Sequence, residues 1–137
     1  MGSASGPAAD GVVTKPSPRP VGETVNRLKQ LVEDKGLTLF AVIDHSGEAR
    51  RAGLEMPDTQ LVVFGSPAAG TPVMVAAPLA ALDLPLKVLV WQDAEGTVSV
   101  SYNAPEYLAS RYQLSVELRS RLEAIEAITD ATVSPAA

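Results

Sequence analysis

One short stretch in the second half of the chain constrains the fold more than any other. Residues 93–96 read Asp-Ala-Glu-Gly, which places aspartate first and glycine fourth in a tight turn. Leu86 to Trp91 before the turn is an apolar strand, and Thr97 to Tyr102 after it alternates between polar and apolar residues. The pattern predicts an antiparallel hairpin, with Thr97, Ser99 and Ser101 on a face in contact with solvent.

Two amphipathic helices are predicted at opposite ends of the sequence. The first covers Val21 to Lys35 and ends at Gly36, because glycine readily adopts the left-handed conformation that stops a helix. The second covers Val116 to Ile128, with Ser115 as its cap. Short helices are expected over Asp44 to Leu54, Pro72 to Ala77 and Ala104 to Arg111, the last starting at a capping-box pattern of Asn103 and Glu106.

The other strands differ in their expected positions in the sheet. Gly11 to Lys15 is predicted as a short edge strand, because Pro16, Pro18 and Pro20 cannot donate ladder hydrogen bonds. Leu37 to Ile43 and Thr59 to Phe64 are apolar on both sides, which is typical of central strands. The order β-α-β-β-β-β-α predicts an α+β fold, a mainly antiparallel sheet with helices packed on one face.

The length of 137 residues suits one domain. We expect that domain over residues 11–128, between a flexible N-terminal tail of residues 1–10 and a C-terminal tail of residues 129–137. No apolar run reaches the roughly 18 residues of a membrane span. No basic segment followed by an apolar core marks a signal peptide. These observations favour a soluble, cytoplasmic protein.

Composition excludes several classes of site. The chain has no cysteine and one histidine, His45, which leaves too few ligands for a structural zinc site. A carboxylate site for a hard cation stays possible, but no pattern indicates a metal or cofactor. The net charge of −5 argues against nucleic-acid binding, which needs a basic surface.

Several motifs, in order, resemble the bacterial and archaeal "domain of unknown function 302" family. The resemblance covers about residues 11–128. It is carried by Val13-Thr14-Lys15-Pro16-Ser17-Pro18, Phe40-Ala41-Val42-Ile43-Asp44-His45, Ala52-Gly53-Leu54, Phe64-Gly65-Ser66-Pro67-Ala68-Ala69-Gly70-Thr71-Pro72, the stretch from Leu82 to Trp91, and Val100-Ser101-Tyr102-Asn103. Ser66 stands where the family pattern has asparagine. The resemblance implies a β-α-β4-α fold like that of the TATA-binding protein and a homodimer, and it implies no activity or catalytic residue.

His45 is the candidate catalytic residue, because an imidazole suits acid–base chemistry near neutral pH. A partner for it would come from Glu55, Asp93 or Tyr102. The alternative is a polar residue that bonds loop backbone.

The segment Gly65 to Thr71 reads Gly-x-x-x-x-Gly-Thr and lacks the lysine of a phosphate-binding loop. Gly70 and Thr71 are candidates for a weaker anion site, with Thr71 as a helix cap and Pro72 as the first helical residue. The alternative is a loop that needs glycine for its backbone conformation.

Lys87 interrupts an apolar strand and shares a face with Leu89 and Trp91, so it could hold an anionic ligand. The alternative is a lysine that extends over apolar surface to reach water. Tyr102 and Trp91 could line a pocket or a dimer face, although packing in the core is the commoner role.

Two main hypotheses follow. One is a dimeric module that binds a small, possibly anionic ligand through Lys87, Gly70, Thr71 and Tyr102, which requires a pocket shared by Lys87 and Thr71. The other is an enzyme that uses His45 as general acid or base. A structural or protein-interaction domain is the third alternative.

Overall fold

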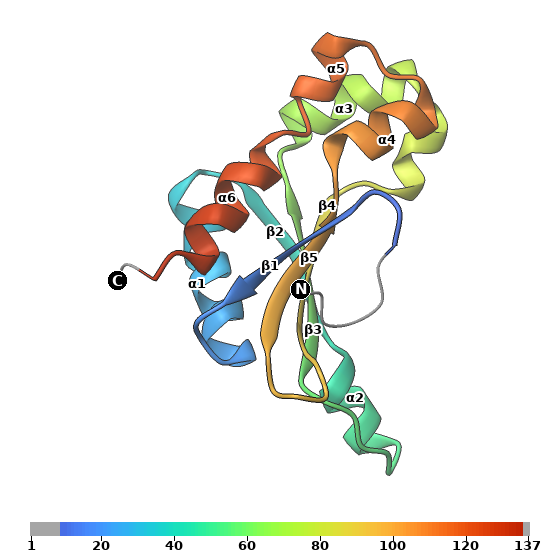
Figure 1. Ribbon diagram of the computed structural model, residues 1–137. Coiled ribbons are helices and arrows are strands. Elements are labelled where there is room, and N and C mark those ends of the chain that lie inside the picture. Colours follow the sequence, from blue (N-terminus) through green and yellow to red (C-terminus); the bar gives the residue numbers. More distant parts are fainter. Residues whose placement is uncertain (1–8, 136–137) are drawn as a thin grey trace.

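The computed structural model describes residues 9–135 and contains one five-stranded sheet, in which every neighbouring pair is antiparallel (Figure 1). The strands are β1 (Val12–Ser17), β2 (Thr38–Asp44), β3 (Thr59–Gly65), β4 (Leu86–Gln92) and β5 (Val98–Asn103). Their order across the sheet is β1-β5-β4-β3-β2. The α+β fold with the element order β-α-β4-α is therefore confirmed.

The hairpin of β4 and β5 forms as predicted. The Asp93 side chain accepts hydrogen bonds from the backbone of Glu95 and Thr97, and Gly96 takes a positive φ of 90°. The expected solvent-facing side is largely covered, however, because Ser99 and Ser101 are only 7% and 9% exposed. Ser101 lies in a short polar network, where it bonds Thr14 at 2.8 Å and accepts the indole N–H of Trp91 at 2.9 Å.

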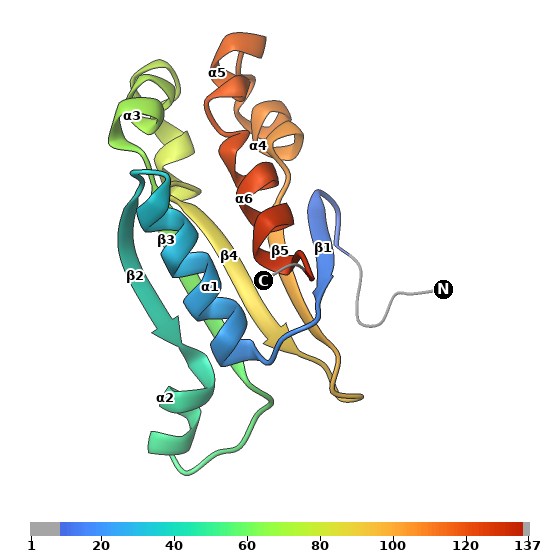
Figure 2. The ribbon, with the colours of Figure 1, turned by 90° about the vertical axis from the view of Figure 1, so that its left-hand side faces the viewer.

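Two helices cover one face of the sheet, α1 (Val21–Asp34) and α6 (Ala124–Val133), as Figure 2 shows from the helix side. The main core lies between them and the sheet. It includes fully buried side chains from α1, β3, β4, β5 and α6, such as Leu28, Phe64, Val90, Val100 and Ile128. The prediction that helices pack on one face is thus confirmed, and the alternate strand residues lie on the opposite, open face.

A second group of short elements closes one end of the sheet. It consists of α3 (Pro67–Ala76), the 3-10 helix η1 (Pro78–Leu82), α4 (Pro105–Tyr112) and α5 (Val116–Ser120), which lie together beyond the strand ends in Figure 1. Their own small core contains Val73, Ala80, Leu108 and Leu122. The α4 helix forms where expected, but no side chain caps it, so the predicted capping box is wrong.

The prediction that Leu37 to Ile43 is a central strand is wrong, because β2 lies at an edge. Its apolar residues serve two surfaces. Val42 packs on the helix-side core, whereas Ile43 is 40% exposed on the open face. A register irregularity between Leu39 and Ala41 also leaves Phe40 50% exposed.

The C-terminal boundary also differs from expectation. The predicted helix over 116–128 is two helices, α5 and α6, separated by turns at residues 121–123. Helix α6 continues to Val133, and Thr129 and Thr132 in the expected tail are fully buried. Their hydroxyls donate to the carbonyls four residues earlier, which allows these polar groups to enter the core. The expected N-terminal tail lies mostly outside the described residues.

Lysine 15 fastens the edge strand β1 to α6. Its Nζ lies 2.8 Å from Asp130, donates to the Thr129 hydroxyl at 2.7 Å, and lies 5.0 Å from the centre of the Tyr102 ring. Burial lowers the pKa of Lys15, but the interactions with Asp130 and Tyr102 outweigh it, so the net shift is upward. Arg27 adds a hydrogen bond from its Nε to the Ala131 carbonyl.

Candidate functional site

A cavity of about 360 Å³ lies where the strand ends meet the short helices, and we call it the end cavity. Its walls come from four parts of the chain. These are the start of β2 together with the end of β3, the first turns of α3, the segment before β4, and the α5–α6 junction. The residues that line it include Phe40, Gly65, Gly70, Thr71, Met74, Leu86 and Arg121. Its size falls within the range of small-molecule sites.

Helix α3 begins earlier than the sequence analysis expected, and this shapes the end cavity. Ser66 is the N-cap, its side chain accepts from the backbone N–H of Ala69 at 3.3 Å, and Pro67 follows it. The predicted cap at Thr71 is therefore wrong, because Ser-Pro five residues earlier is an equally good helix start. Gly70 and Thr71 lie within the helix and line the cavity.

Gly70 lines this wall of the end cavity and adds no side chain to it. A Cβ at this position would have the Met74 Cε as its nearest neighbour, at 4.0 Å. Neither steric crowding nor a positive φ therefore requires glycine here. A Cβ at position 70 would therefore meet only ordinary van der Waals contact.

Arg121 supplies the charge at the end cavity, since among the described residues it is the one charged member of a mainly apolar lining. It is exposed at the α5–α6 junction, and none of the described residues forms an ion pair or side-chain hydrogen bond with its guanidinium. A guanidinium can bind a carboxylate or phosphate with two parallel hydrogen bonds. Nothing local in the sequence indicates Arg121, because the helix predicted over 116–128 is continuous and has no junction at this position.

A polar cluster holds the wall before β4 in place. The Tyr112 hydroxyl donates to the Asp83 carboxylate, and Arg111 lies 3.2 Å from the same oxygen. The hydrogen bond to Asp83 raises the pKa of Tyr112. These contacts join the end of η1 to the end of α4, next to the Leu84 to Leu86 part of the cavity wall.

Lys87 does not line the end cavity, so the structure brings no shared pocket to Lys87 and Thr71. Lys87 lies on the open face, where its Nζ donates to the Pro85 carbonyl at 3.1 Å. Tyr102 lies on the other side of the sheet, 4% exposed in the main core. Of the four residues predicted for a ligand, only Gly70 and Thr71 are therefore together.

We expect Lys87→Met to raise the free energy of unfolding at pH 7, by up to about 1 kcal/mol. Burial lowers the pKa of Lys87, and Asp83 only partly opposes this. The folded chain therefore holds this proton more weakly than the unfolded chain. Stability should rise as the pH increases through the lowered pKa toward 10.5, and the variant should lack that rise.

Urea denaturation at pH 7 and at alkaline pH measures this effect, with Lys29→Met on the exposed side of α1 as the matched control. A Lys87→Met protein that is less stable than the unsubstituted one at pH 7 would contradict the expectation.

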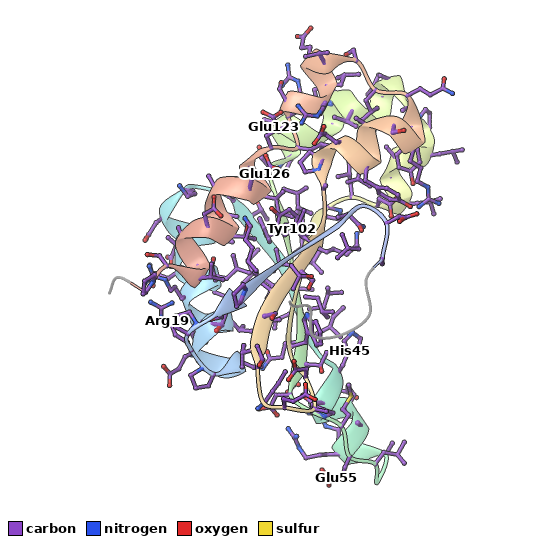
Figure 3. All side chains as sticks on the ribbon, viewed as in Figure 1. Arg19, His45, Glu55, Tyr102, Glu123 and Glu126 are labelled. Atoms are coloured by element: carbon purple, nitrogen blue, oxygen red, sulfur yellow. The ribbon has the colours of Figure 1, made fainter. Side chains whose placement is uncertain are left out.

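His45 is the first residue of α2 (His45–Arg51) and is exposed. It does not line the end cavity, and no described side chain bonds it or forms an ion pair with it. Figure 3 shows His45, Tyr102 and Glu55 well apart, and Asp93 bonds the backbone of its own turn. The structure thus assembles no acid–base site from these residues.

A larger and more open groove, of about 600 Å³, runs between α1 and β2. Its polar residues, Asn26, Lys29, Gln30 and Glu33, lie along α1, and its apolar residues include Leu37 and Leu39. We favour the end cavity as the ligand site because it is more enclosed and its lining is more apolar.

The family model described as "Domain of unknown function DUF302" matches residues 13–132, nearly all of the described chain. The chain belongs to the DUF302 family. A crystal structure titled as an uncharacterized conserved DUF302 protein from Bacillus stearothermophilus has a TM-score of 0.74 to this chain. It covers 91% of this chain and 97% of its own length at 20% identity, so it supports the fold.

Curated relatives of this DUF302 chain carry the name fluoride-specific ion channel. The FluC 1 proteins of Brucella suis and Brucella abortus are each 38% identical over 106 residues, which is 77% of this chain. The match spans only 42% and 39% of those relatives. Within residues 9–135, none of the helices is both long and apolar enough to cross a membrane.

Proposed function

We propose that this DUF302 chain is a binding module for a small, mainly apolar ligand that carries an anionic group. The observation that supports this is the end cavity, a mainly apolar space in which Arg121 is the one charged residue of the lining that residues 9–135 provide. An apolar cavity favours a hydrocarbon body, and a guanidinium without an ion-pair partner among the described residues favours a carboxylate or similar head group. Gly70 and Thr71 remain ligand-lining residues, although not as the helix cap predicted for Thr71, and Arg121 replaces Lys87 as the cation.

The volume sets the size of the ligand. If each non-hydrogen atom takes roughly 30 Å³, the share of a water molecule in the liquid, 360 Å³ holds on the order of 12 such atoms. Octanoate, with ten non-hydrogen atoms, is therefore a suitable probe. Octanol has the same chain without the charge and serves as its neutral counterpart.

We expect octanoate to raise the thermal midpoint in proportion to the logarithm of its concentration. Arg121→Gln should weaken octanoate binding about tenfold by calorimetry, because one charge-assisted interaction is lost, and should leave octanol binding unchanged. Gly70→Leu should abolish binding of both, since its side chain would enter the cavity.

Gly22→Leu is the matched control, because Gly22 also lies in a helix and a Cβ there would meet nothing within 4 Å. Absence of any shift with octanoate, octanol and related acids of four to twelve carbons would overturn the proposal. Equal binding of octanoate by the unsubstituted protein and Arg121→Gln would overturn the role of the charge.

The geometry offers no comparable support for an enzyme based on His45. The homodimer implied by the family resemblance is retained as part of the proposal, because one face of the sheet has no helix packed on it among the described elements.

A further inference from the structure

The side chain of Phe40 reaches the end cavity from an irregular position in the edge strand β2. Leu39 pairs with Phe64 and Ala41 pairs with Val63, so Phe40 has no residue opposite it in the ladder. Two residues against one is the count of a β-bulge, which redirects a side chain and is over-represented next to active sites. Phe40 lines the end cavity and is still 50% exposed, so the protein itself covers the ring only in part.

The space beside this ring is narrow. Gly65 lines the end cavity, and a Cβ there would lie 4.0 Å from the Phe40 Cε2 and 3.6 Å from the Pro85 Cβ. Both are ordinary contact distances between carbon atoms, so the gap at Gly65 takes about one layer of atoms. A planar aromatic ring is one such layer, whereas a saturated ring is puckered and carries hydrogen atoms on both faces.

Two other features of the lining favour an aromatic ligand. Met74 lies on the α3 wall, and a thioether sulfur makes favourable contacts with the edges of aromatic rings. Phe40 is the one aromatic side chain that residues 9–135 contribute to this lining. Aromatic pairs are stabilised beyond the burial of their area, so Phe40 is the group that distinguishes an aromatic ring from another hydrocarbon of equal size.

We propose that the end cavity selects acids whose apolar body is a planar aromatic ring, with Phe40 as the residue that determines this specificity. This rests on the proposed function, because it requires that the cavity bind an apolar acid whose carboxylate meets Arg121. The ring would occupy the gap beside Phe40 and Pro85. 3-Phenylpropanoate, with 11 non-hydrogen atoms, is the probe that matches the capacity of on the order of 12 such atoms.

The matched probe is 3-cyclohexylpropanoate, which has the same carboxylate, the same arm and the same number of non-hydrogen atoms but a puckered ring. Its apolar surface is larger, so burial alone would favour it. In titration calorimetry, the unsubstituted chain should bind 3-phenylpropanoate about fivefold more tightly than the saturated acid, because only the planar ring pairs with Phe40. Phe40→Leu retains an apolar side chain without a ring, so it should bring this ratio to about one and change octanoate affinity less than about twofold.

Two control variants should keep the fivefold ratio. Tyr107→Leu also removes an aromatic ring, but Tyr107 is 36% exposed on α4 and does not line the end cavity. Arg121→Gln should weaken both ring acids equally, because the carboxylate that meets Arg121 is the same in the two probes.

The outcomes separate this inference from the proposed function. Equal affinities for the two ring acids, or tighter binding of the saturated one, would overturn the aromatic specificity and leave the proposed function standing. Octanoate binding without binding of either ring acid would do the same. A ratio that persists in Phe40→Leu, or that Tyr107→Leu removes, would overturn the role of Phe40. If none of the three acids binds, the proposed function fails, and the aromatic specificity fails with it.

Discussion

Phe64→Ala is expected to lower the free energy of unfolding by about 3–5 kcal/mol, a large share of the stability of a domain this size. Phe64 is fully buried at the centre of the main core, on the side of β3 that faces α1. The substitution removes a whole ring and leaves a cavity that a sheet with neighbours on both sides cannot easily collapse. Urea denaturation followed by circular dichroism measures the loss.

The chain supplies its own control, because it has only two phenylalanines. Phe40 is 50% exposed on β2, so Phe40→Ala should cost less than about 1.5 kcal/mol. Because Phe40 lines the end cavity, that variant should weaken octanoate binding instead. Similar stability losses for the two variants would contradict the assignment of Phe64 to the core and Phe40 to the surface.

Deletion of residues 129–137 is expected to cost about 3–5 kcal/mol, although their small residues are typical of a tail. The deletion removes the fully buried Thr129 and Thr132 from the core. It also leaves Lys15 without its partners Thr129 and Asp130, and Arg27 without the Ala131 carbonyl. The edge strand β1 would therefore lose the hydrogen bond and the ion pair that join it to α6.

Deletion of only residues 135–137 is the control, because it retains α6 and the Ser134 carbonyl that Arg19 bonds. Thermal denaturation of the two shortened proteins compares them directly. A protein ending at Ile128 that is as stable as the control would show that the domain ends where the sequence analysis placed it.

The elements that the sequence predicted well are those whose contacts are local. The β4–β5 turn depends on Asp93 and Gly96, three residues apart, and α1 ends at Gly36 with a positive φ of 71°. The start of α2 at Asp44 likewise depends on a hydrogen bond from Gly47, which also lowers the pKa of Asp44. In each case the interacting residues lie within a few positions of each other, so the sequence pattern alone identifies them.

The elements that were misplaced depend on contacts distant in the sequence. β2 and β3 are both apolar on both sides, yet β2 is at the edge, because β3 is the only strand that pairs with it among the described residues. Polar Ser101 is covered because Trp91 and Thr14 from other strands form hydrogen bonds with it, and the covered Ser99 lies opposite Pro16 and Trp91 in the ladder. The threonines of α6 enter the core because the β1 and α1 residues Lys15 and Arg27 hold the end of that helix.

The candidate site shows the same division. Gly70 and Thr71 are predicted from a glycine-containing segment after a strand, but Arg121 comes from a junction 50 residues after Thr71 and carries no local signal. The sequence by itself determined the α+β class, the element order and the turns, because these follow from periodicity and short-range hydrogen bonds. Only the tertiary structure decided which apolar surface is buried and which side chains meet at the end cavity, because burial and charge pairing are properties of neighbours in space.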